Sequence, residues 1–228
     1  MENIISLKSK NIMICGKKNT GKTHLCKKIL QNMDNSLNII ITSSNKDKYI
    51  YNNIGLNKYI YTNFDNNIVQ KIKNYSISQK KQNLNYHIKL IIDEFDIYVY
   101  CSGIFHILLN NIEYNLTNIF ICKHFGLIPK YLLKLFDNFI TTSYCDDHTA
   151  HIISNDLMPH VNKNFLKQNN YTILGKPNLI GKIDKNIIFD HNNKTKYTTH
   201  LPNIYNINEL IIKFKKLNLN NKQHTIYI

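Results

Sequence analysis

An eight-residue turn between an apolar run and a helical pattern is the feature that most constrains this chain. The turn reads GKKNTGKT, from Gly16 to Thr23, and fits G-x-x-x-x-G-K-[ST] at every fixed position. The apolar run before it, Asn11–Cys15, is typical of a buried strand. A turn that leads into a helix N-terminus presents backbone N–H groups and partial positive charge to an anion. The stretch therefore predicts a phosphate-binding loop.

The residue types in this turn predict how a nucleotide is held. Lys22 is expected to reach the β- and γ-phosphates, and Thr23 to place its hydroxyl on Mg²⁺. The backbone of the loop is expected to surround the phosphates, and the residues assigned to nucleotide binding are Gly16, Lys17, Lys18, Asn19, Thr20, Gly21, Lys22 and Thr23. The predicted cofactors are therefore ATP and Mg²⁺.

A second motif, HIKLIIDEFD, contains an apolar run that ends in Asp93 and Glu94. A run of this kind is typical of a buried parallel strand whose C-terminal end faces a ligand. Asp93 is expected to hold Mg²⁺ through water, and Glu94 to orient or deprotonate the attacking water. A plain strand end has the same pattern, but its combination with the phosphate loop favours an NTP hydrolase.

Apolar runs alternate with helical patterns between residues 10 and 143. Strands are predicted at Asn11–Cys15, Leu37–Thr42, Tyr59–Thr62, the run ending at Asp93, Asn118–Cys122 and Phe139–Thr142. Helices are predicted at Lys22–Met33, Asn66–Gln82 and Ile104–Leu116, and another is predicted from Pro129 to Asp137-Asn138. This order favours an α/β fold, a P-loop NTPase with a mostly parallel sheet and helices on both faces.

The whole chain, residues 1–228, is predicted to be one P-loop ATPase domain with a core at 10–143 and a sheet-completing extension at 144–228. In the extension, KIDKNIIFD and KTKYTT are predicted to form a hairpin across Asn192-Asn193, followed by an amphipathic helix at Asn208–Leu217. Tyrosines and lysines interleave between Asn45 and Phe64. They fit either packing in a crossover, which we favour, or contacts to DNA.

Charge is the most unusual property of the composition. The formal net charge is +14, and all 29 Lys and Arg residues are lysines. Clustered lysines gain affinity for nucleic acid by releasing counterions, so the charge favours a polyanionic partner. The abundance of Ile, Asn, Lys and Tyr is also what an A/T-rich coding genome produces, and this alternative stays open.

Other residue patterns exclude several classes of protein. The odd number of scattered cysteines predicts reduced thiols, and these are Cys15, Cys26, Cys101, Cys122 and Cys145. The Cys145-Asp-Asp-His148 sequence near His151 is interpreted as a turn rather than a metal site. No apolar run reaches about 18 residues, and the N-terminus has no signal-peptide pattern, so we expect no membrane span and no secretion.

Three segments together resemble the poxvirus-type DNA-packaging ATPases of large and mid-sized DNA viruses, within the FtsK/HerA group of P-loop motors. They are GKKNTGKT, LIIDEFD and YNLTNIFICKHFGLIPKYLLKLFDNFITTS, and the resemblance covers roughly Asn11 to Ser143. It implies an ATPase that works as a homo-oligomeric ring on double-stranded DNA and drives a viral genome into a capsid. It also implies a capsid or portal-vertex partner, and a location in the host cytoplasm (virus factory) or the virion.

The chain departs from this family at its polar sensor and its arginines. Lys123, beside His124, stands where the family usually has a sensor glutamine, and Glu113 and Leu133-Lys134 stand where it commonly has arginines. A lysine supplies charge to a phosphoryl group as a point donor, without the planar fork of arginine. We expect Lys134 to act as a donor to the neighbouring subunit and Lys123 as a sensor. The alternatives are another lysine, exposed surface charge at both positions, or a slow enzyme.

Two other functions stay compatible with the sequence. A small-molecule or nucleoside kinase has the same loop and size, although its lid usually clamps phosphates with arginine, and this chain has none. A nucleotide-binding structural protein with little hydrolysis is the other alternative, favoured by the same lack of arginine.

Overall fold

A single sheet organises the protein. The computed structural model describes residues 9–31, 36–43, 45–52, 54, 58–84, 86–159, 161–168, 172–175, 179–184, 187–190 and 195–198. The strands are β1 (Asn11–Cys15), β2 (Leu37–Ile41), β3 (Lys58–Tyr61), β4 (Ile88–Ile92), β5 (Leu116–Cys122), β6 (Asn138–Thr141), β7 (Thr172–Gly175), β8 (Leu179–Asp184), β9 (Ile187–Asp190) and β10 (Thr195–Thr198). Their order across the sheet is β10-β9-β8-β7-β6-β1-β5-β4-β2-β3.

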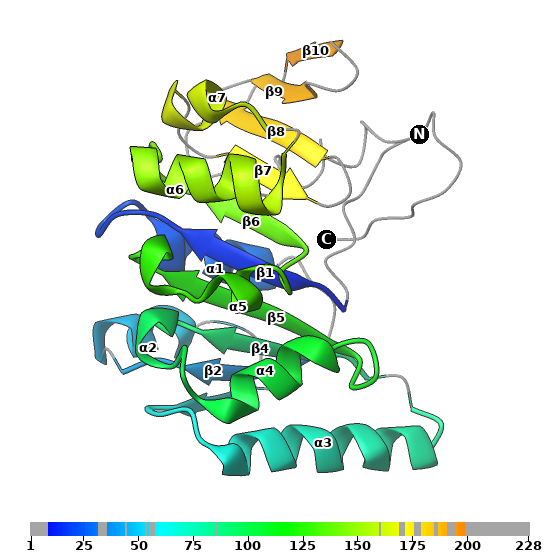
Figure 1. The fold of residues 1–228 in the computed structure, drawn as a ribbon. Helices are drawn as coiled ribbons and strands as arrows, with labels where there is room; N and C mark the ends of the chain where they lie inside the picture. The colour runs from blue at the N-terminus through cyan, green and yellow to red at the C-terminus, as the bar shows by residue number, and fades with distance from the viewer. Residues whose placement is uncertain are drawn as a thin grey trace.

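The sheet has a parallel and an antiparallel part. From β3 at one edge to β6, neighbouring strands pair in parallel. From β6 to β10 they pair antiparallel, which extends the sheet as Figure 1 shows. The predicted mostly parallel α/β sheet is confirmed, and so is the C-terminal hairpin, formed by β9 and β10. The predicted helix at Asn208–Leu217 lies outside the described residues.

Helices cover both faces of the sheet, as predicted. They are α1 (Lys22–Gln31), α2 (Asn45–Asn52), α3 (Asn66–Lys81), α4 (Ser102–Leu109), α5 (Lys130–Leu133), α6 (Asp147–His151) and α7 (Lys163–Gln168). Short helical turns are η1 (Phe95–Ile97) and η2 (Phe125–Leu127), and η3 (Ile152–Leu157) is a π-helical segment.

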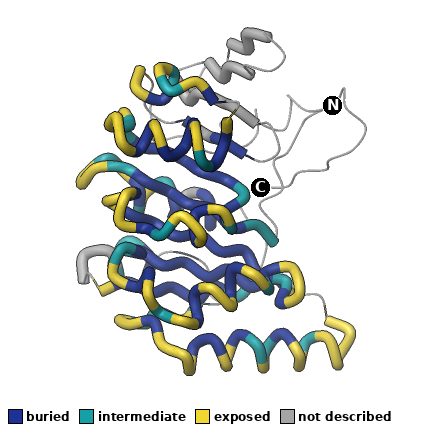
Figure 2. Tube along the Cα trace, in the orientation of Figure 1, coloured by how far each residue is buried: buried dark blue, intermediate teal, exposed yellow. Residues whose placement is uncertain are grey.

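Each parallel strand is buried from both sides because alternate residues face different cores. Ile12 and Ile14 of β1 belong to one apolar cluster, with residues of α1 and α2. Met13 and Cys15 belong to another, with residues of α3, α4 and α5. Figure 2 shows the central strands buried and the outer sides of the helices exposed. The five cysteines are free thiols, and Cys15, Cys26 and Cys122 are buried.

One predicted helix is too long. The helix expected over Ile104–Leu116 is α4, which ends at Leu109, and Leu116 already begins β5. Asn115 has a φ of 50°, a left-handed conformation that a helix does not continue through. The prediction was wrong because Ile112 fits the helical spacing, yet its side chain is 77% exposed.

The segments around Pro129 and after Ser43 also differ from prediction. The helix expected to run from Pro129 to Asp137-Asn138 is the single turn α5, with Pro129 as its N-cap residue and Asn138 already in β6. Between residues 45 and 52, a crossover with no predicted helix contains α2. Tertiary packing determines where both helices form, because neither segment has a helical pattern long enough to give a stable helix in isolation.

The strand order brings the motif residues together at the carboxyl-terminal ends of the parallel strands. Gly16 follows β1, Asp93 follows β4 and Lys123 follows β5, and these strands run in parallel. Thr142 directly follows β6 on the other side of β1. Because the carboxyl-terminal ends of parallel strands lie on the same side of the sheet, segments far apart in the sequence meet around the phosphate loop.

Candidate nucleotide site

The phosphate loop requires glycine at two positions, for different reasons. A Cβ atom on Gly16 would lie 2.3 Å from Oγ1 of Thr142, too close for any side chain. Gly21 has a φ of 85°, in the left-handed region that glycine adopts without strain. Asn19 also has a positive φ, of 63°. The loop is therefore shaped by local conformation and by its contact with the strand end of β6.

The residues after β6 support the loop through hydroxyl groups. Thr20 Oγ1 and Thr142 Oγ1 are 2.6 Å apart, and Ser143 Oγ accepts a hydrogen bond of 3.2 Å from the Lys17 backbone N–H. The Thr20 hydroxyl also donates to the Lys17 carbonyl, at 2.9 Å. Sequence reasoning missed Thr142 and Ser143. Their signal was the position at the end of a strand expected to lie in the parallel sheet.

Lys22 folds over the loop from the first turn of α1. Its Nζ donates to the carbonyl oxygens of Gly16 and Lys17, each at 2.6 Å, and only 8% of the residue is exposed. Burial lowers the pKa of its ammonium group, and the nearby Asp93 carboxylate acts in the opposite direction. An anionic phosphate oxygen is a better acceptor for this buried charge than a neutral carbonyl. The geometry fits the predicted phosphate contact.

Thr23 and Asp93 form the second part of the site. Thr23 Oγ1 donates to Asp93 Oδ2 at 2.9 Å, across 70 residues of sequence. Asp93 is buried, and its Oδ1 accepts the backbone N–H of Glu94 at 3.0 Å. Hydroxyl and carboxylate oxygens are the ligands that Mg²⁺ prefers. The pair brought together here fits the predicted magnesium site.

Glu94 points to different partners from those of Asp93. Its backbone is left-handed, with φ 64° and ψ 44°, a conformation that costs a non-glycine residue on the order of 1 kcal/mol or more. Lys123 Nζ lies 2.7 Å from Oε1, and Ser43 donates its hydroxyl to Oε2. The hydrogen bond from Lys123, and then the one from Ser43, lower the pKa of the Glu94 carboxyl.

Lys123 is held in place by Asp96, the third acid of the DEFD sequence, which sequence reasoning did not single out. The backbone N–H groups of Lys123 and His124 donate to the Asp96 carboxylate at 2.9 and 3.1 Å. The hydrogen bond to Glu94 raises the pKa of the Lys123 ammonium group. The predicted sensor therefore meets the predicted base directly.

The structure does not bring Lys134 to Glu94, where Lys123 lies. It is the exposed C-cap residue of α5. Its charge acts on Asp156 of η3, whose pKa is lowered mainly by the hydrogen bond from Lys130, with Lys130 Nζ 2.8 Å from Asp156 Oδ2. Lys134 thus belongs to the α5–η3 side of the protein, whereas Glu94 is held by Lys123 from the end of β5.

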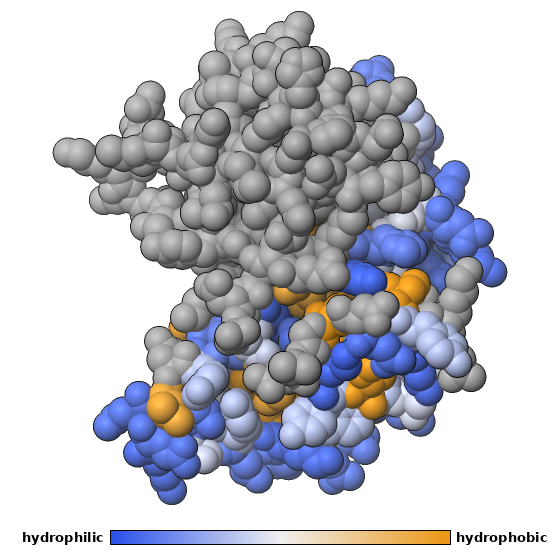
Figure 3. Space-filling model, turned by 180° about the vertical axis from the view of Figure 1, so that it is seen from behind, coloured by the Kyte–Doolittle hydropathy of each residue, from blue (hydrophilic) through white to orange (hydrophobic). Residues whose placement is uncertain are grey.

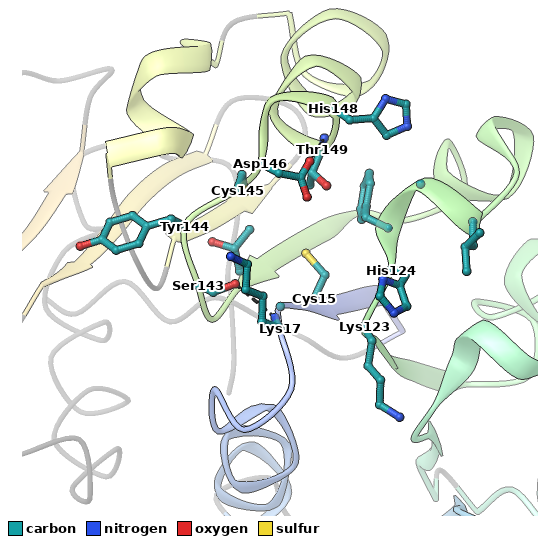
Figure 4. Close-up of a pocket in the computed structure, with 15 residues that line it drawn as sticks. Cys15, Lys17, Lys123, His124, Ser143, Tyr144, Cys145, Asp146, His148 and Thr149 are labelled. Carbon is teal, nitrogen blue, oxygen red and sulfur yellow. Dashed lines mark hydrogen bonds between the residues drawn. The ribbon is translucent and has the colours of Figure 1, made fainter.

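A cavity of about 570 Å³ opens beside the beginning of the loop. Its walls are Gly16 and Lys17, the segment after β5, and the turn between β6 and α6. Figure 4 shows Lys17 beside Ser143 on the left of Cys15, Lys123 and His124 on its right, and Asp146 and Thr149 from the start of α6 above them. The cavity therefore lies between the phosphate loop and the segment that contains Lys123, the predicted sensor.

The parallel sheet, the loop between β1 and α1, and the acids after β4 together define the fold of a P-loop NTPase.

Solved structures share this fold. The genome packaging NTPase B204 from Sulfolobus turreted icosahedral virus 2, in complex with AMP, has a TM-score of 0.59 and 19% identity over 77% of this chain and 97% of that protein. B204 from Sulfolobus turreted icosahedral virus, a DNA-packaging ATPase, has a TM-score of 0.56 and 16% identity over 84% and 97%. EssC (ATPases 2 and 3) from Geobacillus thermodenitrificans has a TM-score of 0.54 and 12% identity, over 91% of this chain and 43% of EssC.

No protein-family profile and no curated protein sequence matches the chain. The likeness to B204 and EssC therefore concerns the fold.

The contacts of Glu94 predict how its carboxyl titrates. Lys123→Met should raise the pKa of Glu94, because it removes the largest cause that lowers it, and Ser43→Ala should raise it less. The contribution of the ion pair to the free energy of unfolding is present above the ordinary pKa of glutamate and is lost as the pH falls through the lowered pKa. The measurement is an NMR titration of the side-chain carboxyl carbon. Lys130→Met is the matched control, and an unchanged Glu94 pKa in Lys123→Met would contradict the ion pair.

Proposed function

We propose that this chain is an ATP-hydrolysing motor that packages viral double-stranded DNA into a capsid. The observation that carries the proposal is the placement of Lys22, Thr23, Asp93 and Glu94 along one edge of the sheet, in contact with one another or with the loop. The fold shared with B204, a genome packaging NTPase and DNA-packaging ATPase, supports the direction of the proposal.

Each residue of the site has a separate role in the proposed hydrolysis of ATP. The loop amides and Lys22 bind the β- and γ-phosphates. Thr23 and, through water, Asp93 would hold Mg²⁺, which would neutralise charge that develops on the phosphate oxygens. Glu94 accepts a proton from the water that attacks the γ-phosphorus, and the bond to the β–γ bridging oxygen breaks to give ADP and phosphate.

Glu94 has to leave Lys123 before it can act as this base. In the structure both of its carboxylate oxygens accept hydrogen bonds, from Lys123 and from Ser43. The Lys123 ammonium group, 39% exposed on its side chain, has the freedom to turn toward a γ-phosphate oxygen. We infer that Lys123 acts as the sensor by exchanging one anionic partner for the other, which frees Glu94.

The partners proposed are double-stranded DNA, further copies of the chain in a ring, and a capsid or portal-vertex protein, with the host cytoplasm or the virion as the location. The net charge of +14 supports the DNA partner, and the described surface seen in Figure 3 is mostly hydrophilic with separate apolar patches. No helix in the described part of the chain has the length and apolar content to cross a membrane.

A kinase is the second candidate. The observation that favours it is the cavity of about 570 Å³ beside the loop, which has room for a small acceptor molecule. The two proposals differ in what stimulates ATP turnover: duplex DNA for the motor, and a small hydroxyl compound for the kinase.

Duplex DNA should stimulate ATP hydrolysis and bind with little sequence preference. If about five lysines neutralise phosphates, the logarithm of the binding constant should fall with the logarithm of salt concentration at a slope of about −4.5. Turnover with and without DNA, and a salt titration of binding, provide the measurements. Two duplexes of unrelated sequence serve as controls. A slope near zero with no stimulation would assign the charge to coding bias and favour the kinase.

Two substitutions should separate binding from chemistry. Lys22→Ala should weaken ATP binding because it removes a direct phosphate contact. Glu94→Gln should leave binding nearly intact and lower kcat by at least about a hundredfold, as for the loss of a positioned base. Equilibrium binding of a fluorescent ATP analogue and steady-state turnover measure the two effects. Equal loss of binding in both variants would refute the role of Glu94.

The lack of arginine makes Lys134 the proposed donor to the neighbouring subunit, since the transferring phosphoryl group needs a cation that the loop alone does not supply. Lys134→Ala should keep ATP affinity and lose turnover. Mixing it with Lys22→Ala should restore some hydrolysis, because one mutant contributes an intact pocket and the other an intact donor. Lys130→Ala, on the same helix, is the matched control. Full activity of Lys134→Ala alone would make it an ordinary surface lysine.

A further inference from the structure

The interleaved tyrosines between Asn45 and Phe64 have very different surroundings in the structure. Tyr49 and Tyr59 are 75% and 57% exposed, whereas Tyr51 is fully buried. Tyr51 lies on α2 and packs in the cluster that contains Cys26 of α1 and Ile91 of β4. A phenylalanine ring would supply the same apolar contact, so the buried hydroxyl of Tyr51 calls for a separate explanation.

The hydroxyl of Tyr51 reaches the magnesium carboxylate. Its Oη donates to Asp93 Oδ2 at 3.0 Å, the same oxygen that accepts the Thr23 hydroxyl at 2.9 Å. The other carboxylate oxygen, Oδ1, accepts the N–H of Glu94 at 3.0 Å. Three donors, from α2, from α1 and from the chain after β4, thus act on one carboxylate and fix its rotation.

The donor direction of this hydrogen bond follows from the chemistry of the two groups. A tyrosine phenol, with an ordinary pKa of about 10, is protonated at neutral pH, whereas an aspartate carboxyl is ionised. The phenol therefore keeps its proton, and the carboxylate has none to donate while it is ionised. A hydrogen bond to an ionised acceptor is stronger than one between neutral groups.

We propose that Tyr51 is a positioning residue of the magnesium site, and that its hydroxyl sets the Mg²⁺ affinity by holding the Asp93 carboxylate in the orientation the metal's water shell needs. Mg²⁺ demands near-ideal octahedral geometry, so a carboxylate that acts through water has a narrow range of useful orientations. Partners of metal ligands commonly change metal affinity by a factor of 10 to 100 when they are removed. The proposal rests on the proposed function, because Mg²⁺ with ATP is the ligand.

The position of Tyr51 also connects the metal site to the crossover after β2. Ser43, which donates to Glu94, precedes α2, and Tyr51, which donates to Asp93, lies in the last turn of α2. The two neighbouring acids of the site are therefore both oriented by the segment between β2 and β3. Tyr51 orients the Asp93 carboxylate by a hydrogen bond, as Ser43 orients the Glu94 carboxylate.

Tyr51→Phe tests this role because it removes one oxygen and keeps the ring. In the presence of a saturating non-hydrolysable ATP analogue, the apparent dissociation constant for Mg²⁺, measured from the shift in thermal unfolding midpoint, should rise about tenfold. Affinity for the analogue without Mg²⁺ should stay unchanged. Turnover should recover at high Mg²⁺ concentration, which separates a positioning effect from loss of the fold.

Tyr114→Phe is the matched control. Tyr114 is also a buried tyrosine, 5% exposed, and its hydroxyl lies 2.7 Å from His106 Nε2 on α4. This variant should lose stability without any change in Mg²⁺ affinity. In an Asp93→Asn background, Tyr51→Phe should weaken Mg²⁺ binding no further, because the hydroxyl acts through the carboxylate.

The outcomes separate this inference from the proposed function. If the wild-type chain shows no Mg²⁺-dependent nucleotide binding, both fail. If the wild type binds Mg²⁺ with the analogue and Tyr51→Phe binds it with the same affinity, only the role of Tyr51 is overturned. A loss in Tyr114→Phe equal to that in Tyr51→Phe would also overturn it, because general destabilisation would then explain the change.

Discussion

The pairing of β1 with its two parallel neighbours is the constraint on which the rest of the site depends. Cys15, the last residue of β1, is in register with Cys122 of β5 on one side and with Thr141 of β6 on the other. The next residue on each strand is therefore Gly16, Lys123 and Thr142. The parallel register alone places the phosphate loop between Lys123 and Thr142, whose hydroxyl contacts the loop.

The two acids after β4 are adjacent in sequence but serve different parts of the site. Asp93 is buried with hydroxyl donors from α1 and α2, while the left-handed backbone of Glu94 turns its side chain toward Lys123 and Ser43. Strain of this kind persists where surrounding contacts hold it, and it is common at functional sites. Here it directs the side chains of Asp93 and Glu94 toward different partners.

Lysine chemistry dominates the cationic side of the site. Lys22 is buried with a lowered pKa, and Lys123 is partly exposed with a raised one, so the two ammonium groups have opposite surroundings. A buried lysine binds a fixed phosphate, whereas an exposed lysine on a flexible stem can move between two anions. In a chain without arginine, the proposed function would give lysine two roles, one at each of these positions.

The sequence by itself determined the phosphate loop, the acid pair after a buried strand, and the alternation that makes an α/β sheet, because each is a local pattern set by backbone conformation and burial. Tertiary structure alone decided that Lys123 meets Glu94, that Thr142 closes on Gly16, and that Tyr51 reaches Asp93. It also shortened α4 and α5 and made α2 a helix. These features depend on strand order and register, which join residues up to 127 positions apart, and no local periodicity contains that information.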